Sequence, residues 1–207
     1  IERLNPALLP LEKFDINPKY IEVQRLAPYM SRGTDVPVVL DLMIHDIDLV
    51  LALVKSPVRK ISANGISIMT NSVDMANARI QFQNGTVANI TSSRVAKDRV
   101  RKMKVFQQDL YITVDFLRSL TEVYRVMDAD KSDPSAIMSA PLVSKGRHRQ
   151  IFYEKPAIKK QDALKMELEN FIEAAQGKVK PIVDGAAGKE ALDLALQIHN
   201  KILEDIQ

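Results

Sequence analysis

Residues 76–93 read ANARIQFQNGTVANITSS, and this stretch decides the fold. Two segments with strand-like composition, 76–83 and 86–93, flank the dipeptide Asn84-Gly85. An Asn-Gly pair between such segments is the strongest short-range signal of a β-hairpin, because both residues tolerate the backbone angles of a tight turn. The stretch therefore predicts two antiparallel strands joined by a short turn.

Further strands are predicted on both sides of this hairpin. Alternating or β-branched apolar content indicates strands at 21–30, 58–70, 102–108, 110–116, 122–127 and 150–154. Residues 128–149 are polar and contain Pro134, Pro141 and Gly146, which predicts a loop. Since consecutive strands are joined by short turns, we expect an antiparallel sheet of about six or seven strands.

Helical patterns stand before and after the run of strands. We expect a short helical segment in residues 1–13, a helix over 38–54, an amphipathic helix over 162–176 and a final helix over 184–205 that Asp184 caps. Helices segregated at the ends of a run of strands pack on one face of the sheet. The fold class is therefore predicted to be α+β, with an open, mainly antiparallel sheet and helices on one face.

The composition excludes several classes of function. The chain has 207 residues, enough to bury a substantial core, and no cysteine, which excludes a disulfide scaffold and a thiolate nucleophile. A net charge of +3 gives no reason to expect nucleic acid as a partner. No apolar run reaches the roughly 18 residues of a membrane span, and no signal peptide opens the sequence. We therefore expect a cytoplasmic protein that binds neither nucleic acid nor a membrane.

The helix predicted over 38–54 reads VVLDLMIHDIDLVLALV and carries the candidate chemistry. At about 100° per residue, Asp41, His45 and Asp48 share one narrow stripe of a helix that is otherwise mostly apolar. We expect apolar surroundings for these groups, in which an unpaired carboxylate is unfavourable. A carboxylate one turn from an imidazole can fix its tautomer and raise its basicity, which suits a base that removes a hydroxyl proton.

Two other interpretations of this stripe stay open. The His–Asp pair is also compatible with a purely structural role, because buried ion-pair networks are common. The spacing also permits a metal site with Asp41, His45 and Asp48 as ligands. The remaining histidines, His148 and His199, lie far along the sequence, in a polar loop and in the final helix.

Three stretches, in this order, resemble the Gfo/Idh/MocA family of oxidoreductases. The pattern Asp41-x-x-x-His45 followed by Asp46-x-Asp48 resembles the family's catalytic helix. The opening IERLNPA resembles the family's junction between two domains, in the form found in members that oxidise the 3-hydroxyl of nucleotide-linked amino sugars. The segments MELENF, from residue 166, and PIVDG, from residue 181, resemble the end of the family's chain.

The resemblance implies that residues 1–207 form a C-terminal, substrate-binding and dimerisation domain. The resemblance further implies that an N-terminal nucleotide-binding (Rossmann) domain is missing from this sequence. That domain is expected to bind most of the NAD or NADP, so the isolated chain is expected to be inactive. No Gly-x-Gly-x-x-Gly follows a predicted strand, and Gly185 and Gly188 are interpreted as the start of a helix. The motif Glu154-Lys155-Pro156 matches the family's catalytic-lysine motif but follows the sheet, the wrong place in the order.

The resemblance also assigns roles to single residues. His45 matches the catalytic histidine, Asp41 matches the carboxylate that supports it, and Met43 stands where the family usually has glycine. The substrate-binding candidates are basic or amide side chains near the junction and near the catalytic helix: Arg3, Asn5, Arg94, Lys97 and Arg32. Basic groups of this kind hold a diphosphate or carboxylate through charge-assisted hydrogen bonds, or form a solvated surface.

Together these inferences predict the substrate-binding half of an NAD(P)-dependent oxidoreductase. Its substrate is a sugar with a secondary hydroxyl, such as a UDP-linked amino sugar, and the chain is expected to form a homodimer or homotetramer through the sheet. Two alternatives remain: a non-catalytic dimerisation or ligand-binding module, and a metal-dependent hydrolase that uses the Asp41, His45 and Asp48 stripe.

Overall fold

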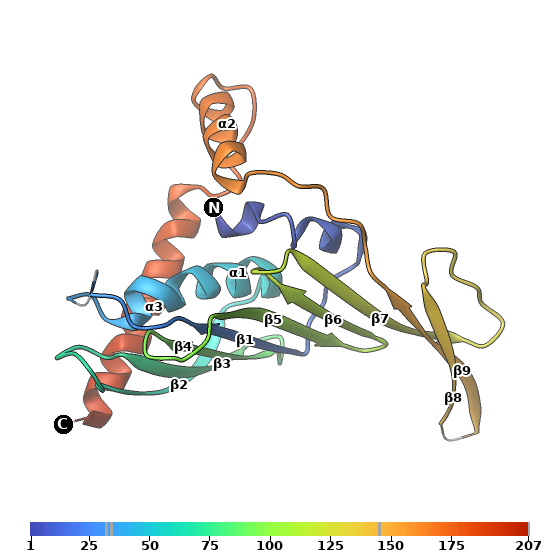
Figure 1. Ribbon diagram of the computed structural model, residues 1–207, viewed down its shortest axis with the longest axis horizontal. Coiled ribbons are helices and arrows are strands. Elements are labelled where there is room, and N and C mark those ends of the chain that lie inside the picture. The colour runs from blue at the N-terminus through green and yellow to red at the C-terminus, as the bar shows by residue number, and fades with distance from the viewer. Residues whose placement is uncertain (32, 34, 145, 207) are drawn as a thin grey trace.

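A computed structural model describes residues 1–31, 33, 35–144 and 146–206. The strands of this part of the chain form one open sheet in the order β2-β3-β4-β1-β5-β6-β7-β9-β8 (Figure 1). They are β1 (Tyr20–Leu26), β2 (Val58–Ile66), β3 (Met75–Phe82), β4 (Val87–Ser93), β5 (Val100–Gln107), β6 (Leu110–Asp115), β7 (Leu120–Asp128), β8 (Met138–Ser144) and β9 (Arg147–Glu154). Neighbours pair antiparallel except β1 and β4, which are parallel. The predicted fold class is confirmed.

The hairpin around Asn84-Gly85 is confirmed as β3 and β4. Its turn is longer than the dipeptide: the Phe82 amide donates to the Thr86 carbonyl at 2.9 Å, which leaves residues 83–85 as the connection. Within it Gly85 has a positive φ of 85°. The side-chain oxygen of Asn84 accepts a hydrogen bond from the Thr86 amide at 3.0 Å. This is the pattern of a three-residue loop, in which the last residue takes the left-handed conformation.

The prediction of a loop over 128–149 is wrong for its second half. Residues 138–144 form β8, and β9 begins at Arg147, so the sheet has nine strands where about six or seven were expected. Pro141 lies within β8, which is the outermost strand at this edge of the sheet. Proline is tolerated on an edge strand, because its missing N–H deprives no neighbouring strand of a hydrogen bond.

Two helices cover one face of the sheet: α1 (Ile44–Val54), with the π-helical turn η3 (Val39–Met43) before it, and α3 (Gly185–Ile206). Ile47 of α1 and Ile198 of α3 are fully buried in the common core. The helix predicted over 38–54 is confirmed, although its first turn is π rather than α. Such turns are frequent near functional sites, and this one directly precedes His45.

The close approach of α3 to the sheet depends on a glycine in β2. A Cβ atom built on Gly65 would lie 2.8 Å from Val73 Cγ1 and 2.9 Å from Ile202 Cγ2, so no larger side chain fits there without a shift. The start of α3 is capped as predicted, because Asp184 Oδ1 accepts a hydrogen bond from the Ala187 amide at 2.8 Å.

The remaining helical elements lie near the start of the chain and after the last strand. The segment 1–13 forms two 3₁₀ helices, η1 (Glu2–Leu4) and η2 (Leu9–Lys13). The amphipathic helix predicted over 162–176 is confirmed as α2 (Ala163–Ala175), but it stands beside η1 and buries none of its residues (Figure 1). The expectation that the helices pack on the sheet therefore holds for α1 and α3 and not for α2. No described helix has the length and apolar character needed to cross a membrane.

Candidate functional site

The side chains of Asp41 and His45 are exposed rather than enclosed in the core, although the neighbours of His45 partly desolvate it. Met43, between them, faces the core and is fully buried. The cationic neighbour of Asp41 is Arg94, whose Nη2 lies 3.9 Å from Asp41 Oδ2. The stripe that carries Asp41 and His45 thus points away from the sheet, where a substrate can reach it. The support of His45 by Asp41 remains a prediction.

The buried acid of this helix is Asp46, the residue after His45. Its carboxylate is fully buried and accepts two hydrogen bonds from Arg25 of β1, both at 2.7 Å. Glu2 of η1 lies 3.4 Å from Arg25 and also accepts a hydrogen bond from Arg101 of β5. These four charges form a network that joins the N-terminal segment, the sheet and α1 directly behind His45.

The surroundings favour the neutral form of the His45 imidazole. Desolvation lowers its pKa, and the positive charge of Arg25 lowers it further. The carboxylates of Glu2 and Asp46 oppose this shift but do not cancel it. A histidine with a lowered pKa is unprotonated at neutral pH, and an unprotonated imidazole can accept a proton.

His45 opens onto a hollow of about 210 Å³. Its lining comes from η1, α1 and the start of α3: Ile1, Glu2, Ile44, His45, Asp48, Val183, Gly188 and Ala191. Sites for small molecules usually have volumes of about 300–1,000 Å³. The hollow is therefore large enough for part of a sugar, and the rest of a larger substrate must be held by other surfaces.

Arg3, predicted at a domain junction, reaches the edge of this hollow through its ion pair with Asp48, whereas Asn5 is not among the described residues that line it. Arg3 makes a two-pronged ion pair with Asp48, with Nε 2.9 Å from Oδ2 and Nη2 2.5 Å from Oδ1. Asn5 Oδ1 accepts a hydrogen bond from the Ala7 amide at 3.0 Å. Arg3 is thus fixed to Asp48, which lies one turn after His45 on α1. The side-chain oxygen of Asn5 stabilises the backbone turn between Asn5 and Ala7.

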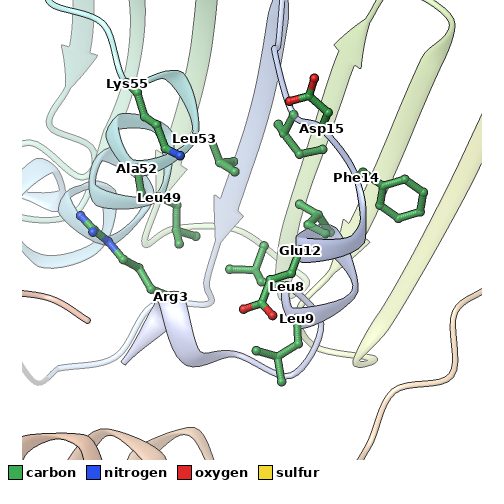
Figure 2. A pocket seen from close by; sticks show the side chains of 12 residues that line it. Arg3, Leu8, Leu9, Glu12, Phe14, Asp15, Leu49, Ala52, Leu53 and Lys55 are labelled. Carbon is green, nitrogen blue, oxygen red and sulfur yellow. The ribbon is translucent and has the colours of Figure 1, made fainter. Parts of the chain in front are cut away.

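A larger cavity of about 460 Å³ lies between η2 and the second half of α1, and Figure 2 shows Arg3 at its edge. Its walls include Leu8, Leu49 and Leu53, with Lys55 and Asp15 among the charged residues (Figure 2). Among the described residues that line it there is no histidine. We therefore place the candidate site at His45, although the cavity there is smaller.

The other substrate-binding candidates are Arg94, Lys97 and Arg32. Arg94 is buried and donates to the backbone carbonyls of Gly33, at 2.9 Å, and Val36, so its guanidinium fixes this loop. Lys97 is exposed. Arg32 lies outside the described residues. A direct contact between any of them and a substrate remains a prediction.

The geometry does not favour the metal site considered above. Among the residues that the structure describes, no group of three His, Asp or Glu side chains is close enough to hold a metal ion. Asp48 is paired with Arg3, and Asp41 lies near Arg94, so a cation would compete with an arginine at both carboxylates.

The sequence analysis missed the buried network of Glu2, Arg25, Asp46 and Arg101. A signal for it exists in the strand pattern: Arg25 follows Ile21 and Val23 at the inward-facing positions of β1. A charge at such a position requires a buried partner. Asp46 lies about 100° around the helix from His45, and this turn places it on the side that faces the sheet.

The chain is similar in sequence to one family of known proteins. Residues 21–112 match the family model of the GFO/IDH/MocA C-terminal domain. Over 200 residues the chain is 36% identical to the UDP-N-acetylglucosamine 3-dehydrogenase of Acidithiobacillus ferrooxidans, an alignment that covers 96% of this chain and 59% of that enzyme.

Solved structures agree with this match. A structure of the Acidithiobacillus ferrooxidans enzyme superposes on this chain with a TM-score of 0.84 at 34% sequence identity. The superposition covers 100% of this chain and 61% of the enzyme's chain. An oxidoreductase domain protein from Kribbella flavida gives a TM-score of 0.78 at 12% identity, covering 99% of this chain and 62% of its own, a likeness that shows the fold alone. The chain thus spans 59% to 62% of the length of these relatives.

Proposed function

Since this chain belongs to the Gfo/Idh/MocA family, we propose that it is the substrate-binding part of an NAD(P)-dependent dehydrogenase for a UDP-linked amino sugar. The relative at 36% identity is a dehydrogenase that acts at position 3 of UDP-N-acetylglucosamine. We extend that substrate class, and the position of the oxidised hydroxyl, to this protein.

The observation that carries the proposal is the environment of His45. The imidazole is accessible from a hollow, its pKa is lowered, and a buried charge network fixes the helical turn that bears it. A secondary alcohol that loses its carbon-bound hydrogen as hydride must also lose its hydroxyl proton. In our proposal the nitrogen of His45 accepts that proton, and Arg3 and Asp48 fix the edge of the hollow.

The described residues do not fit the phosphates of a dinucleotide. The glycines at the start of α3 follow a loop rather than a strand, and the Asp184 carboxylate already accepts the Ala187 amide. A second anion at this helix terminus would be repelled. We therefore assign the nicotinamide cofactor, which supplies the hydride acceptor when bound, to an upstream domain of the family's longer members.

A substrate panel tests the proposal. We expect the protein, with its upstream domain, to reduce NAD or NADP in the presence of UDP-linked N-acetylamino sugars. Free sugars and inositols should react far more slowly, because they lack the diphosphate that an exposed basic group such as Lys97 would recognise. The formation of reduced nicotinamide is followed by absorbance. Turnover of inositols or free sugars alone would contradict the proposed substrate, and no turnover with any of them would favour a non-catalytic binding module.

A further inference from the structure

A further hollow of about 500 Å³ lies between two connections at one end of the sheet. The first runs from β1 to η3 and the second from β2 to β3, and Figure 1 shows both at the end of the molecule where η3 begins. An aromatic ring and several polar side chains line this hollow: Tyr29, Asp35, Met69, Thr70, Asn71 and Ser72. A concave site with a few polar groups is typical of small-molecule binding.

The wall that the β2–β3 connection contributes is held in place by Asp74. This fully buried carboxylate accepts hydrogen bonds from the amides of Ile68, Met69 and Thr70 at 2.8, 2.7 and 2.9 Å. The Thr70 hydroxyl donates a fourth bond at 2.7 Å. Burial alone would raise the pKa of Asp74, but these bonds to the charged form lower it to about 2. The backbone that leads into Asn71 is therefore fixed before any ligand binds.

Arg94 links this hollow to the stripe of Asp41 and His45. Its backbone amide donates to the Asp74 carbonyl at 3.0 Å, and its guanidinium holds the β1–η3 connection through two backbone carbonyls. The same guanidinium lies 3.9 Å from Asp41, which precedes His45 by about one helical turn. The hollow and the candidate base thus lie near the same end of the helix formed by η3 and α1.

The polar side chains of the hollow are available to a ligand. Tyr29, Asp35 and Asn71 are exposed, and no hydrogen bond or ion pair joins their side chains to another described residue. Their chemistry matches the parts of a nucleoside. A tyrosine ring stacks on the flat face of a base. An asparagine amide both donates to and accepts from the edge of a base, and a carboxylate accepts hydrogen bonds from ribose hydroxyls.

We propose that this hollow binds the nucleoside of the nucleotide-linked sugar, with Tyr29 against the base, Asn71 at its edge and Asp35 at the ribose. The inference deepens the proposed function and rests on it for the class of substrate. The hollow at His45, of about 210 Å³, holds only part of such a molecule. Since the diphosphate separates the sugar from the nucleoside, these two parts need separate sites on one side of the protein.

The position of Lys97 agrees with this arrangement. The Ala96 amide donates to the Ala27 carbonyl at 3.0 Å, which places Lys97 next to the start of the β1–η3 connection. Lys97 is exposed, so its ammonium group can reach a phosphate near this hollow.

Binding of UDP alone tests the inference, because it needs neither the sugar nor turnover. The protein with its upstream domain is titrated with UDP in a calorimeter. Tyr29→Ala should raise the Kd on the order of tenfold or more, because stacking on the ring is lost, and Tyr29→Phe should bind as the wild type does. Asn71→Ala should raise the Kd by about two- to tenfold. The matched control is Asn17→Ala, an exposed asparagine before the opposite end of β1, which should leave the Kd unchanged.

Two results would overturn the inference: no binding of UDP to the wild type, or the wild-type Kd in both Tyr29→Ala and Asn71→Ala. A protein that binds UDP with the expected losses but reduces no nicotinamide would refute the proposed function and leave the nucleoside site in place. Turnover of UDP-N-acetylglucosamine with a KM that Tyr29→Ala does not change would support the proposed function and refute the site.

Discussion

Replacement of Asp46 by asparagine is expected to lower the free energy of unfolding by about 3–5 kcal/mol. The Asp46 carboxylate is fully buried and makes two hydrogen bonds of 2.7 Å to Arg25. The substitution leaves a buried guanidinium without its main counter-charge, and Glu2, at 3.4 Å, is too far away to replace it fully. Urea unfolding of wild type and variant measures the difference.

Asp48→Asn is the matched control on the same helix. The ion pair of Asp48 with Arg3 is partly exposed, with side-chain fractions of 18% and 19%, so its loss should cost about 1 kcal/mol or less. The double variant Asp46→Leu with Arg25→Met removes both buried charges and should recover much of the lost stability. Equal losses for Asp46→Asn and Asp48→Asn would show that the buried network does not hold α1 in place.

The substitution His45→Ala is expected to reduce kcat/KM by about 10²–10⁴-fold, the usual contribution of a positioned general base. Because the side chain is exposed, the free energy of unfolding should change little. Initial rates of nicotinamide reduction with UDP-N-acetylglucosamine, measured on the protein with its upstream domain, give the first quantity. Urea unfolding gives the second.

His148→Ala provides the control, since His148 is an exposed histidine on β9. It should keep wild-type kinetics. A His45→Ala variant that is unstable but retains its rate would assign His45 a structural role. If both variants lost a similar amount of activity, the loss could not be assigned to the position of His45 in the hollow beside α1.

The parts of the fold that were predictable depend on local sequence. The Asn84-Gly85 turn and the alternating residues around it identified β3 and β4, because a hairpin is specified by neighbouring residues. The apolar run over 38–54 identified the helix for the same reason. β8 was missed because proline usually marks a loop, and only the position of β8 at the sheet edge makes Pro141 acceptable.

The candidate site was predictable only in part. The spacing of Asp41 and His45 placed them on one stripe, but helical periodicity cannot say which stripe faces the core when most of the helix is apolar. The network behind His45 joins Glu2, Arg25, Asp46 and Arg101, which are far apart in sequence, so its contacts become visible only in the folded chain. The same limit applies to α2, whose pattern predicts a helix but not the direction of its apolar face.

The pH dependence of kcat/KM tests the central claim, that His45 accepts the hydroxyl proton, most directly. The charges around the imidazole are Arg25 and Arg101, which lower its pKa, and Glu2 and Asp46, which raise it, with Asp48 beside the same hollow. Desolvation adds to the lowering, so the base is unprotonated at neutral pH and becomes protonated only below its ordinary value of 6.5. We predict that kcat/KM of the wild type falls on the acid side with an apparent pKa below 6.5, and that His45→Ala loses this acid limb. The same acid limb in wild type and His45→Ala would contradict the claim, because another group would then be the proton acceptor.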